Sequence, residues 1–426
     1  MPSRTALAAL TSRWRSAAAR VAGTLAGGAR WAGLGGPAGG LGAGGLGAGV
    51  ALSGTVWPGG DAEPYHGVVL VGRDGRIAAL GPPAAVPVPD AVRTLGGPGC
   101  WVGPGVIDAH VHLAFGTAEA ALRGGVVGVR DLGAPRGDAL RWRTGHRPPP
   151  PGRPYVGVAG PILTAPGGYP SRSWGADGFA AFVATPAAAR LVVRGLAGDG
   201  VDLVKIALEA GPDGRWPMPP PGVVRAVVDA AHDAGLRVTA HALTIEAVVR
   251  ALDAGADELA HTPTQRLPEP LVDRIAAAGI PVVSTLQTFF STGTGRVAAG
   301  NAAALHRAGA RLVYGTDLGN AGTRPGVDPR ELDRLADAGL GRRGALLAAT
   351  LWAARLPGVR NRTGRLTVGE PAALVLLAGD PTVEPGVWSL PLAVVCDGRL
   401  VEPAGSAPDT LEQAPRGGAP DDRQGR

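Results

Sequence analysis

The stretch RVTAHALTIEAVVRALDAGADELAHT, residues 237–262, contains one complete structural unit of the chain. A strand-like run at 236–241 precedes a helical pattern at 244–255, and another strand-like run follows at 257–261. A strand, a helix and a second strand in this order are typical of a βαβ unit with parallel strands. We therefore expect two adjacent parallel strands here, covered by one helix.

The same alternation continues in both directions along the chain. Helical patterns at 221–235 and 268–279 separate further strand-like runs. The eight expected strands are 106–112, 125–131, 155–159, 202–207, 236–241, 257–261, 281–285 and 311–316. Eight β/α units in roughly 250 residues are typical of a (β/α)8 TIM barrel, which is an α/β fold. An open doubly wound parallel sheet is the alternative.

Strand-rich segments flank this region on both sides. Residues 67–81 indicate two strands joined by an Asp-Gly turn, and 364–381 and 392–403 have the same character. We expect these segments to pair in one small composite β domain, arranged as a β-sandwich. The expected bounds are 50–104 plus 363–403 for the β domain and 105–362 for the barrel.

The two ends of the chain differ from the rest in composition. Residues 1–49 are rich in Gly, Ala and Arg and carry no acidic residue, whereas 404–426 are rich in Pro, Gly, Asp and Arg. Such segments bury too little apolar surface to offset their ordering entropy, so we expect both to be disordered. An Arg-rich, acid-poor start is also a feature of transit peptides, although a flexible extension is the preferred interpretation.

Composition excludes several classes of protein. Only Cys100 and Cys396 are cysteines among 426 residues, which excludes a disulfide scaffold. Residues 1–60 contribute +5 of the formal net charge of +6, so the net charge does not indicate a nucleic-acid groove. No apolar stretch is long enough for a membrane span. We expect a cytoplasmic protein that acts on a small molecule, without nucleic-acid or membrane partners, and compatible with a homo-oligomer.

Metal-binding side chains stand at the ends of the expected strands, where barrels of this kind build their active sites. His110 and His112 lie two residues apart on one strand, so both face the same side. Four other expected strands end with one such residue each, namely Lys205, His241, His261 and Asp317. Four of the eight histidines in the chain lie at strand ends, which favours a metal site. We expect Asp108, which precedes His110 and His112, to be structural or to support the ligands from behind.

Lys205 is the one lysine in the chain, since the other 40 of the 41 basic residues are arginines. Arginine can replace lysine wherever only a positive charge is needed. A position that keeps lysine therefore indicates a need for a nitrogen that can deprotonate and react, with codon bias as the alternative. Arg130 and Asp131, which end the second strand, are expected to form a structural ion pair, with a contact at the rim of the barrel as the alternative.

Five motifs together resemble the amidohydrolase superfamily of metal-dependent hydrolases. They are PGVIDAHVHL (104–113), VDLVKIAL (201–208), VTAHA (238–242), DELAHT (257–262) and YGTD (314–317). Within that superfamily they resemble the imidazolonepropionase-related branch, which includes enzymes that cleave Xaa-Pro dipeptides. The resemblance extends over about residues 50–403. It implies a hydrolase that cleaves an amide or cyclic amide C–N bond of a small molecule.

The resemblance also implies a ligand set for two divalent ions, with zinc as the default metal. His110, His112 and Asp317 would bind one ion, and His241 and His261 the second. Lys205, carboxylated by CO2, would bridge the two ions as an anionic carbamate. Asp317 would also act as the general acid and base.

Substrate contacts are expected from the long loop at 160–185, where Tyr169 and Arg172 are the candidates. The related branch often has His at the position of Tyr169 and usually has Asp at the position of Ala373. Two alternatives remain for the function. One is a mononuclear deaminase-type enzyme that uses His110, His112, His241 and Asp317, and the other is a non-catalytic barrel of the same fold.

Overall fold

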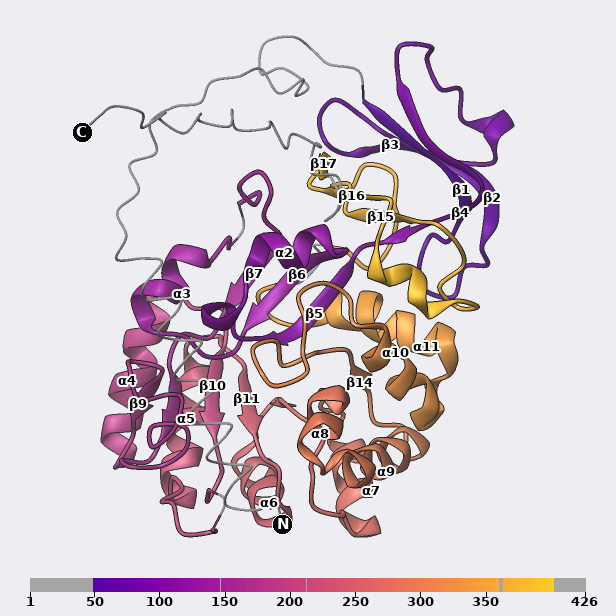
Figure 1. Cartoon of the computed structure of the whole chain (residues 1–426). Coiled ribbons are helices and arrows are strands. Elements are labelled where there is room, and N and C mark those ends of the chain that lie inside the picture. The colour runs from indigo at the N-terminus through magenta and orange to yellow at the C-terminus, as the bar shows by residue number, and fades with distance from the viewer. Residues whose placement is uncertain (1–48, 146, 212, 360–362, 402–426) are drawn as a thin grey trace, which may run out of the picture.

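A computed structural model describes residues 49–145, 147–211, 213–359 and 363–401 (Figure 1). The segments expected to be disordered lie outside the described residues, apart from Gly49. The described chain is a mixed α/β fold with one composite sheet and two parallel sheets. Among the described residues, no helix combines the length and apolar character needed to cross a bilayer.

The composite sheet joins the two ends of the described chain. Its seven strands lie in the order β17-β16-β15-β4-β1-β2-β3. They are β1 (Val50–Val56), β2 (Tyr65–Val71), β3 (Ile77–Gly81), β4 (Arg93–Pro104), β15 (Leu374–Leu377), β16 (Ala393–Cys396) and β17 (Arg399–Val401). The antiparallel pairing of β15 with β4 connects the two halves. The terminal segments therefore meet as expected, while their arrangement as a β-sandwich stays a prediction.

The remaining strands form two parallel sheets. One contains β5 (Val106–Val111), β6 (Val126–Asp131) and β7 (Tyr155–Val158). The other has the order β14-β13-β12-β11-β10-β8-β9. Its strands are β8 (Ile162–Thr164), β9 (Ala180–Phe182), β10 (Val204–Ala207), β11 (Val238–His241), β12 (Glu258–Leu259), β13 (Val282–Val283) and β14 (Leu312–Val313). The expected α/β fold with parallel strands is confirmed, and closure into one barrel stays a prediction.

Backbone hydrogen bonds link the two parallel sheets at two places. The N–H of Ala109 donates to the carbonyl of Tyr314 (3.2 Å), and the N–H of Asp202 donates to the carbonyl of Val158 (2.9 Å). The carboxyl ends of the strands from both sheets consequently lie near one another. This end of the strands carries the residues that the sequence singles out.

Helices lie outside the parallel strands (Figure 1). Those over the strands that follow β8 include α4 (Pro186–Asp199), α5 (Pro221–Asp233), α6 (Ile245–Ala254), α7 (Glu269–Ala278), α8 (Leu286–Thr292) and α9 (Gly295–Arg307). The others are α2 (Ala118–Arg123), α3 (Arg136–Trp142), α10 (Pro329–Leu335) and α11 (Gly341–Leu347). The bounds of α5, α6 and α7 agree closely with the expected helical patterns.

The sequence of α6 shows how these helices are specified. Thr244 precedes the helix, and its side chain accepts a hydrogen bond from the N–H of Ala247. Gly255 ends the helix in the left-handed conformation, with a φ of 83°. Val248 and Ala251 on its inner face are buried.

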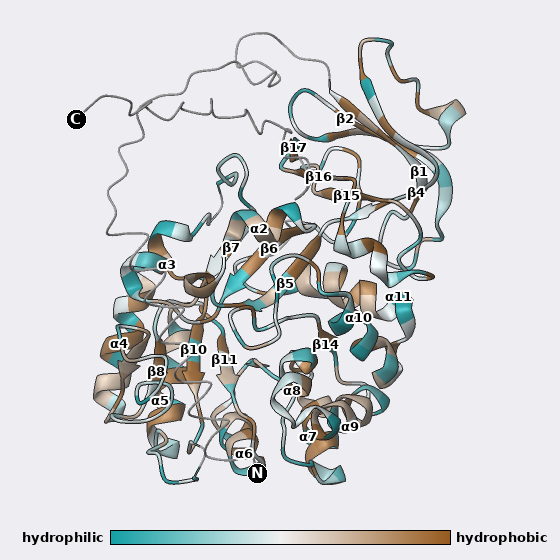
Figure 2. Ribbon diagram, viewed as in Figure 1, coloured by the Kyte–Doolittle hydropathy of each residue, from teal (hydrophilic) through white to brown (hydrophobic). Residues whose placement is uncertain are grey.

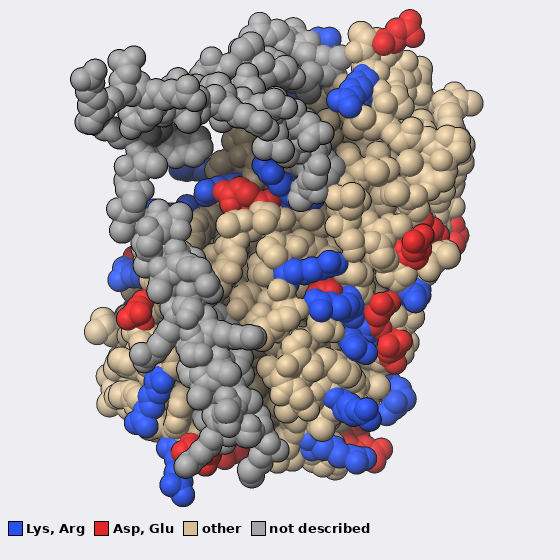
Figure 3. All heavy atoms as spheres, in the orientation of Figure 1, with Lys and Arg blue, Asp and Glu red and all other residues tan. Residues whose placement is uncertain are grey.

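The same division of apolar and polar residues holds for the whole molecule. Figure 2 shows apolar strands and amphipathic helices. Figure 3 shows that acidic and basic side chains are interspersed on the face in view.

A buried ion pair crosses the interior of the parallel strands. Arg130 of β6 is fully buried and donates both terminal nitrogens to Glu258 of β12, at 2.9 Å each. The Thr239 hydroxyl donates to the same carboxylate at 2.8 Å. Asp131 faces the other side of its strand and accepts a hydrogen bond from the N–H of Leu113. Both residues are structural as expected, but they do not pair with each other.

Glu258→Ala would leave the Arg130 guanidinium buried without a counter-charge. We expect the free energy of unfolding, measured by urea denaturation followed by circular dichroism, to fall by about 3–5 kcal/mol. Glu246→Ala, which breaks the exposed pair with Arg250, is the control and should change stability by about 0.5 kcal/mol or less. Equal effects of the two substitutions would contradict a stabilising role for the buried pair.

Candidate metal centre

Six of the residues predicted from the sequence meet at the carboxyl ends of the parallel strands. His110, Lys205 and His241 lie within β5, β10 and β11, whereas His112, His261 and Asp317 follow β5, β12 and β14. All six are buried. They line a cavity of about 20 Å³ together with Ile162, Tyr169, Trp174, Ala207 and Asn320. A cavity of this size accommodates a single water molecule.

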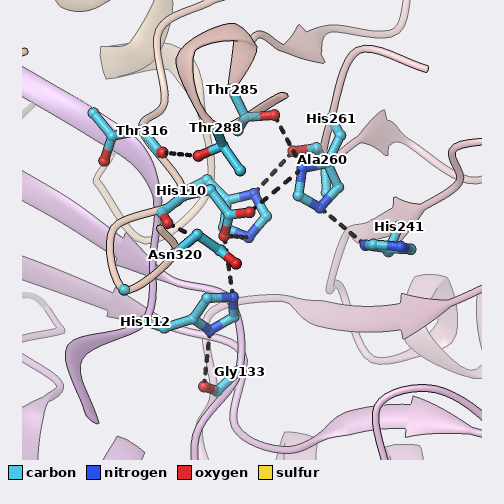
Figure 4. A network of polar contacts seen from close by, with 12 residues as sticks. His110, His112, Gly133, His241, Ala260, His261, Thr285, Thr288, Thr316 and Asn320 are labelled. Carbon is cyan, nitrogen blue, oxygen red and sulfur yellow. Dashed lines mark hydrogen bonds and ion pairs between the residues drawn. The ribbon is translucent and has the colours of Figure 1, made fainter. Parts of the chain in front are cut away.

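Two of the imidazoles are oriented by backbone carbonyls. His110 Nδ1 lies 2.9 Å from the carbonyl oxygen of Ala260, and His112 Nδ1 lies 3.1 Å from that of Gly133 (Figure 4). A carbonyl can only accept, so Nδ1 must carry the proton in both neutral rings. The lone pair is then on Nε2, which in each ring faces Asp317.

The other two imidazoles contact each other. His261 Nδ1 lies 3.0 Å from the Thr285 hydroxyl oxygen, and its Nε2 lies 3.0 Å from His241 Nδ1 (Figure 4). Two neutral rings can make this contact only if a proton lies between the nitrogens. A shared cation would satisfy both lone pairs equally well.

Asp317 lies opposite the first pair of imidazoles. Its Oδ1 is 3.3 Å from His110 Nε2 and 3.4 Å from His112 Nε2. The residue has a φ of 56°, a left-handed conformation that is uncommon outside glycine. Its N–H donates to the carbonyl of His110 at 2.8 Å, which holds this conformation in place. Backbone strain of this kind is concentrated at functional sites.

Several polar atoms in the cavity are buried without a hydrogen-bond partner among the described residues. They are His110 Nε2, His241 Nε2, Lys205 Nζ and Asp317 Oδ1. Buried polar groups are nearly always paired, so this set indicates a ligand. One donor atom each from His110, His261 and Asp317 lie within 4.8 Å of one another. Imidazole and carboxylate ligands suit zinc and similar divalent ions, and the residues present therefore fit a metal.

Burial controls the protonation of these groups. It lowers the pKa of Lys205 to about 7 and the pKa values of His110 and His261 well below their ordinary value. Burial would raise the pKa of Asp317, but His110, His112 and Lys205 together hold that pKa below its usual range. Near neutral pH, His110 and His261 are thus neutral and Asp317 is ionised, as metal binding requires.

Aromatic side chains of the loop after β8 cover the cavity. The Tyr169 ring lies 4.8 Å from the His241 ring, and the Trp174 ring lies 4.9 Å from the His112 ring. Trp174 Nε1 donates to the Tyr169 hydroxyl at 3.1 Å, which joins the two rings. Tyr169 therefore reaches the cavity, whereas Arg172 is exposed and does not line it.

Sequence reasoning missed several neighbours of the site. Trp174 and Asn320 line the cavity, and Asn320 Nδ2 donates to the carbonyl of Asp317 at 3.1 Å. Glu209 Oε2 lies 3.8 Å from His241 Nε2. Glu209 and Asn320 each follow the end of a strand by a few residues, and this placement was the available signal.

Asp108 connects the first strand of the site to the last. Its carboxylate accepts from the N–H of Thr316 (3.0 Å), from the Thr316 hydroxyl (2.5 Å) and from the N–H of His110 (3.2 Å). Burial raises the pKa of Asp108 to about 7, an effect that these hydrogen bonds oppose. Asp108 is thus structural, as the sequence predicts, and it fixes the residue next to Asp317.

Known proteins are similar to this chain in sequence and in fold. The profile described as "Amidohydrolase family" matches residues 156–401. An uncharacterized protein of Mycobacterium tuberculosis (strain ATCC 25618 / H37Rv) is 28% identical over 347 residues, 72% of this chain and 86% of the relative. The imidazolonepropionase of Acidiphilium cryptum (strain JF-5) is 43% identical over 51 residues, 12% of this chain and 13% of that enzyme.

Solved structures agree with the sequence comparison. A "putative prolidase" from Bifidobacterium longum superposes with a TM-score of 0.71 at 27% identity, covering 84% of this chain and 96% of that one. The chain belongs to the amidohydrolase family, as its match over more than half of its length shows. Within the family it falls in the imidazolonepropionase and Xaa-Pro dipeptidase-like branch, and it is a hydrolase of carbon–nitrogen bonds.

Thr316→Val would remove the short hydrogen bond to Asp108 and leave a buried carboxylate oxygen unpaired. We expect the free energy of unfolding in urea to fall by about 1–3 kcal/mol. Thr350→Val is the matched control, because Thr350 is equally buried but its hydroxyl donates to the carbonyl of Leu346, only four residues earlier in the chain. A loss no larger than that of the control would show that Asp108 does not depend on this contact.

Proposed function

We propose that this protein is a metal-dependent amidohydrolase that cleaves an amide or cyclic amide bond of a small molecule. The proposal rests on the buried side chains that converge at the strand ends, four of whose polar atoms have no hydrogen-bond partner among the described residues. His110 Nε2, His112 Nε2 and Asp317 would hold one divalent ion. His241 Nδ1 and His261 Nε2 would hold the second, and zinc is the expected metal.

Lys205 would join the two ions as a carbamate. Its Nζ is buried without a hydrogen-bond partner among the described residues. An ammonium group has no lone pair for a metal, whereas the neutral amine can add CO2 and release a proton. The resulting carbamate is an anion with two donor oxygens. A guanidinium group cannot react in this way, and this chemistry accounts for the lysine at position 205.

The chain's own groups would bind the substrate and transfer protons. When bound, the two ions supply a Lewis acid for the substrate carbonyl and lower the pKa of water. Asp317 Oδ1 would accept the proton of the attacking water and return it to the leaving nitrogen. The Tyr169 hydroxyl accepts from Trp174, so its own proton remains available for the substrate carbonyl oxygen. Arg172 would contact substrate only after the loop moves.

The fold proposal extends the two parallel sheets to one (β/α)8 barrel over residues 105–362. The hydrogen bonds from Ala109 to Tyr314 and from Asp202 to Val158 support this closure. Residues 50–104 plus 363–403 would form the separate composite β domain. We further propose a cytoplasmic location, supported by the absence of a disulfide between the free thiols of Cys100 and Cys396.

A mononuclear deaminase-type site is the second candidate function. It is favoured by the close approach of His110 Nε2 and His112 Nε2 to Asp317 Oδ1, at 3.3 and 3.4 Å, which is sufficient for one ion. Such a site would use His110, His112, His241 and Asp317 and would need no bridging carbamate. The buried, unpaired amine of Lys205 favours the binuclear site instead.

The metal content of the purified, zinc-loaded enzyme should be about two ions per chain, because the donor set divides into two groups joined by Lys205. Inductively coupled plasma mass spectrometry provides the count. Chelation should abolish hydrolysis of a panel of dipeptides, N-acyl amino acids, lactams and imidazolones, and added zinc should restore it. One ion per chain would support the mononuclear site, and hydrolysis that survives complete metal removal would contradict both.

Lys205→Ala and Lys205→Arg should both lose bound metal and reduce turnover by roughly 100-fold or more, since neither side chain can form a carbamate. Acetate or propionate with added metal should partly restore Lys205→Ala, because a small carboxylate can occupy the vacated bridging position. Circular dichroism would verify that both variants fold. Wild-type turnover in Lys205→Arg would exclude the carbamate.

A further inference from the structure

Glu209 is a largely buried carboxylate beside the candidate metal centre. It lies two residues after β10, and its side chain is 15% exposed. Among the described residues, its one ionic contact is with His241 Nε2, at 3.8 Å, which is longer than a hydrogen bond. A carboxylate that is mostly removed from water needs a donor or a cation nearby. The nitrogen of His241 is the partner that the structure offers.

The outer partner of His241 differs in charge from those of the other three imidazoles. His110 and His112 contact backbone carbonyls, and His261 contacts a hydroxyl group. These three partners are neutral and lie within 3.1 Å of the ring nitrogen. His241 faces a carboxylate instead, and its Nε2 has no hydrogen-bond partner.

The tautomer of His241 connects Glu209 to metal binding. In the proposed function, Nδ1 of His241 faces His261 Nε2 and would bind the second ion. A neutral imidazole that gives its Nδ1 lone pair to a metal must carry its proton on Nε2. That N–H would point toward Glu209 and could donate to its carboxylate. Carboxylates placed behind a metal-binding histidine orient the ring and make it a stronger ligand.

Other contacts limit the ring to this orientation. Tyr169 lies 4.8 Å from the His241 ring with an interplanar angle of 28°, so it covers one face. His261 occupies the Nδ1 edge of the ring, as Figure 4 shows. Glu209 lies beyond the opposite edge. The ring is therefore bounded on a face and on both nitrogen-bearing edges, and Glu209 provides the one negative charge among these three contacts.

We propose that Glu209 is a positioning residue that holds His241 in its metal-binding tautomer and so sets the affinity for the ion on the His241–His261 side. This inference rests on the proposed function. The affinity for the ion held by His110, His112 and Asp317 should not depend on Glu209, because the imidazoles of His110 and His112 do not contact Glu209.

The test compares metal affinity in Glu209→Gln, Glu209→Asp and wild type. Each protein is dialysed against a series of zinc buffers, and bound zinc is counted by mass spectrometry. We expect Glu209→Gln to bind one of its two ions about 10–100-fold more weakly, with the other unchanged. Glu209→Asp restores the charge and should recover part of the affinity. Glu246→Gln, near the start of α6, is the control and should match wild type.

Three outcomes would overturn the inference. In the first, Glu209→Gln binds both ions as tightly as wild type does. In the second, both ions weaken equally, which indicates a general loss of packing. In the third, Glu209→Asp is no better than Glu209→Gln, which excludes the charge as the cause. Failure of the proposed function would appear separately, as a wild-type protein that binds fewer than two zinc ions per chain.

Discussion

Buried polar atoms require partners, and the described residues supply no hydrogen-bond partner for four such atoms at the candidate metal centre. Two imidazoles, an amine and a carboxylate present unpaired atoms inside a cavity that accommodates one water molecule. Leaving such atoms unpaired is costly because they have lost their contacts with bulk water. Cations at the site would satisfy His110 Nε2, Asp317 Oδ1 and a carboxylated Lys205, whereas His241 Nε2 faces Glu209. This requirement links the fold of the parallel strands to the hydrolytic chemistry of the amidohydrolase family.

Hydrogen bonds from the surrounding structure hold the residues that the site needs in precise positions. Carbonyls behind His110 and His112 set which ring nitrogen faces inward, and Asp108 fixes the segment that carries Asp317. The pair of Arg130 and Glu258 lies among the same strands, with Thr239 in register beside Lys205. These groups contact no substrate themselves. They keep the inward-facing donors from rotating away, so the site is organised before any ligand arrives.

Local spacing in the sequence predicted much of this site, whereas contacts between distant residues could not be predicted. The two-residue interval of His110 and His112, the single lysine and the strand-end positions of His241, His261 and Asp317 are all visible along one chain. Glu258, by contrast, is 128 residues from Arg130, so no local pattern indicates their pairing. No local pattern indicates that Trp174 contacts His112 or that Glu209 lies beside His241 either. Their side chains meet only because loops and strands are folded together.

The composite sheet has a consequence for how the protein is made. Strand β4 pairs with β15, so Pro104 lies opposite Leu374 and most of the polypeptide separates them. During synthesis, one edge of β4 must remain unpaired until the ribosome has produced nearly the whole chain. Pairings between such distant segments form slowly, and exposed strand edges attract other chains in the meantime. The newly made enzyme should therefore depend on molecular chaperones until its final strands emerge.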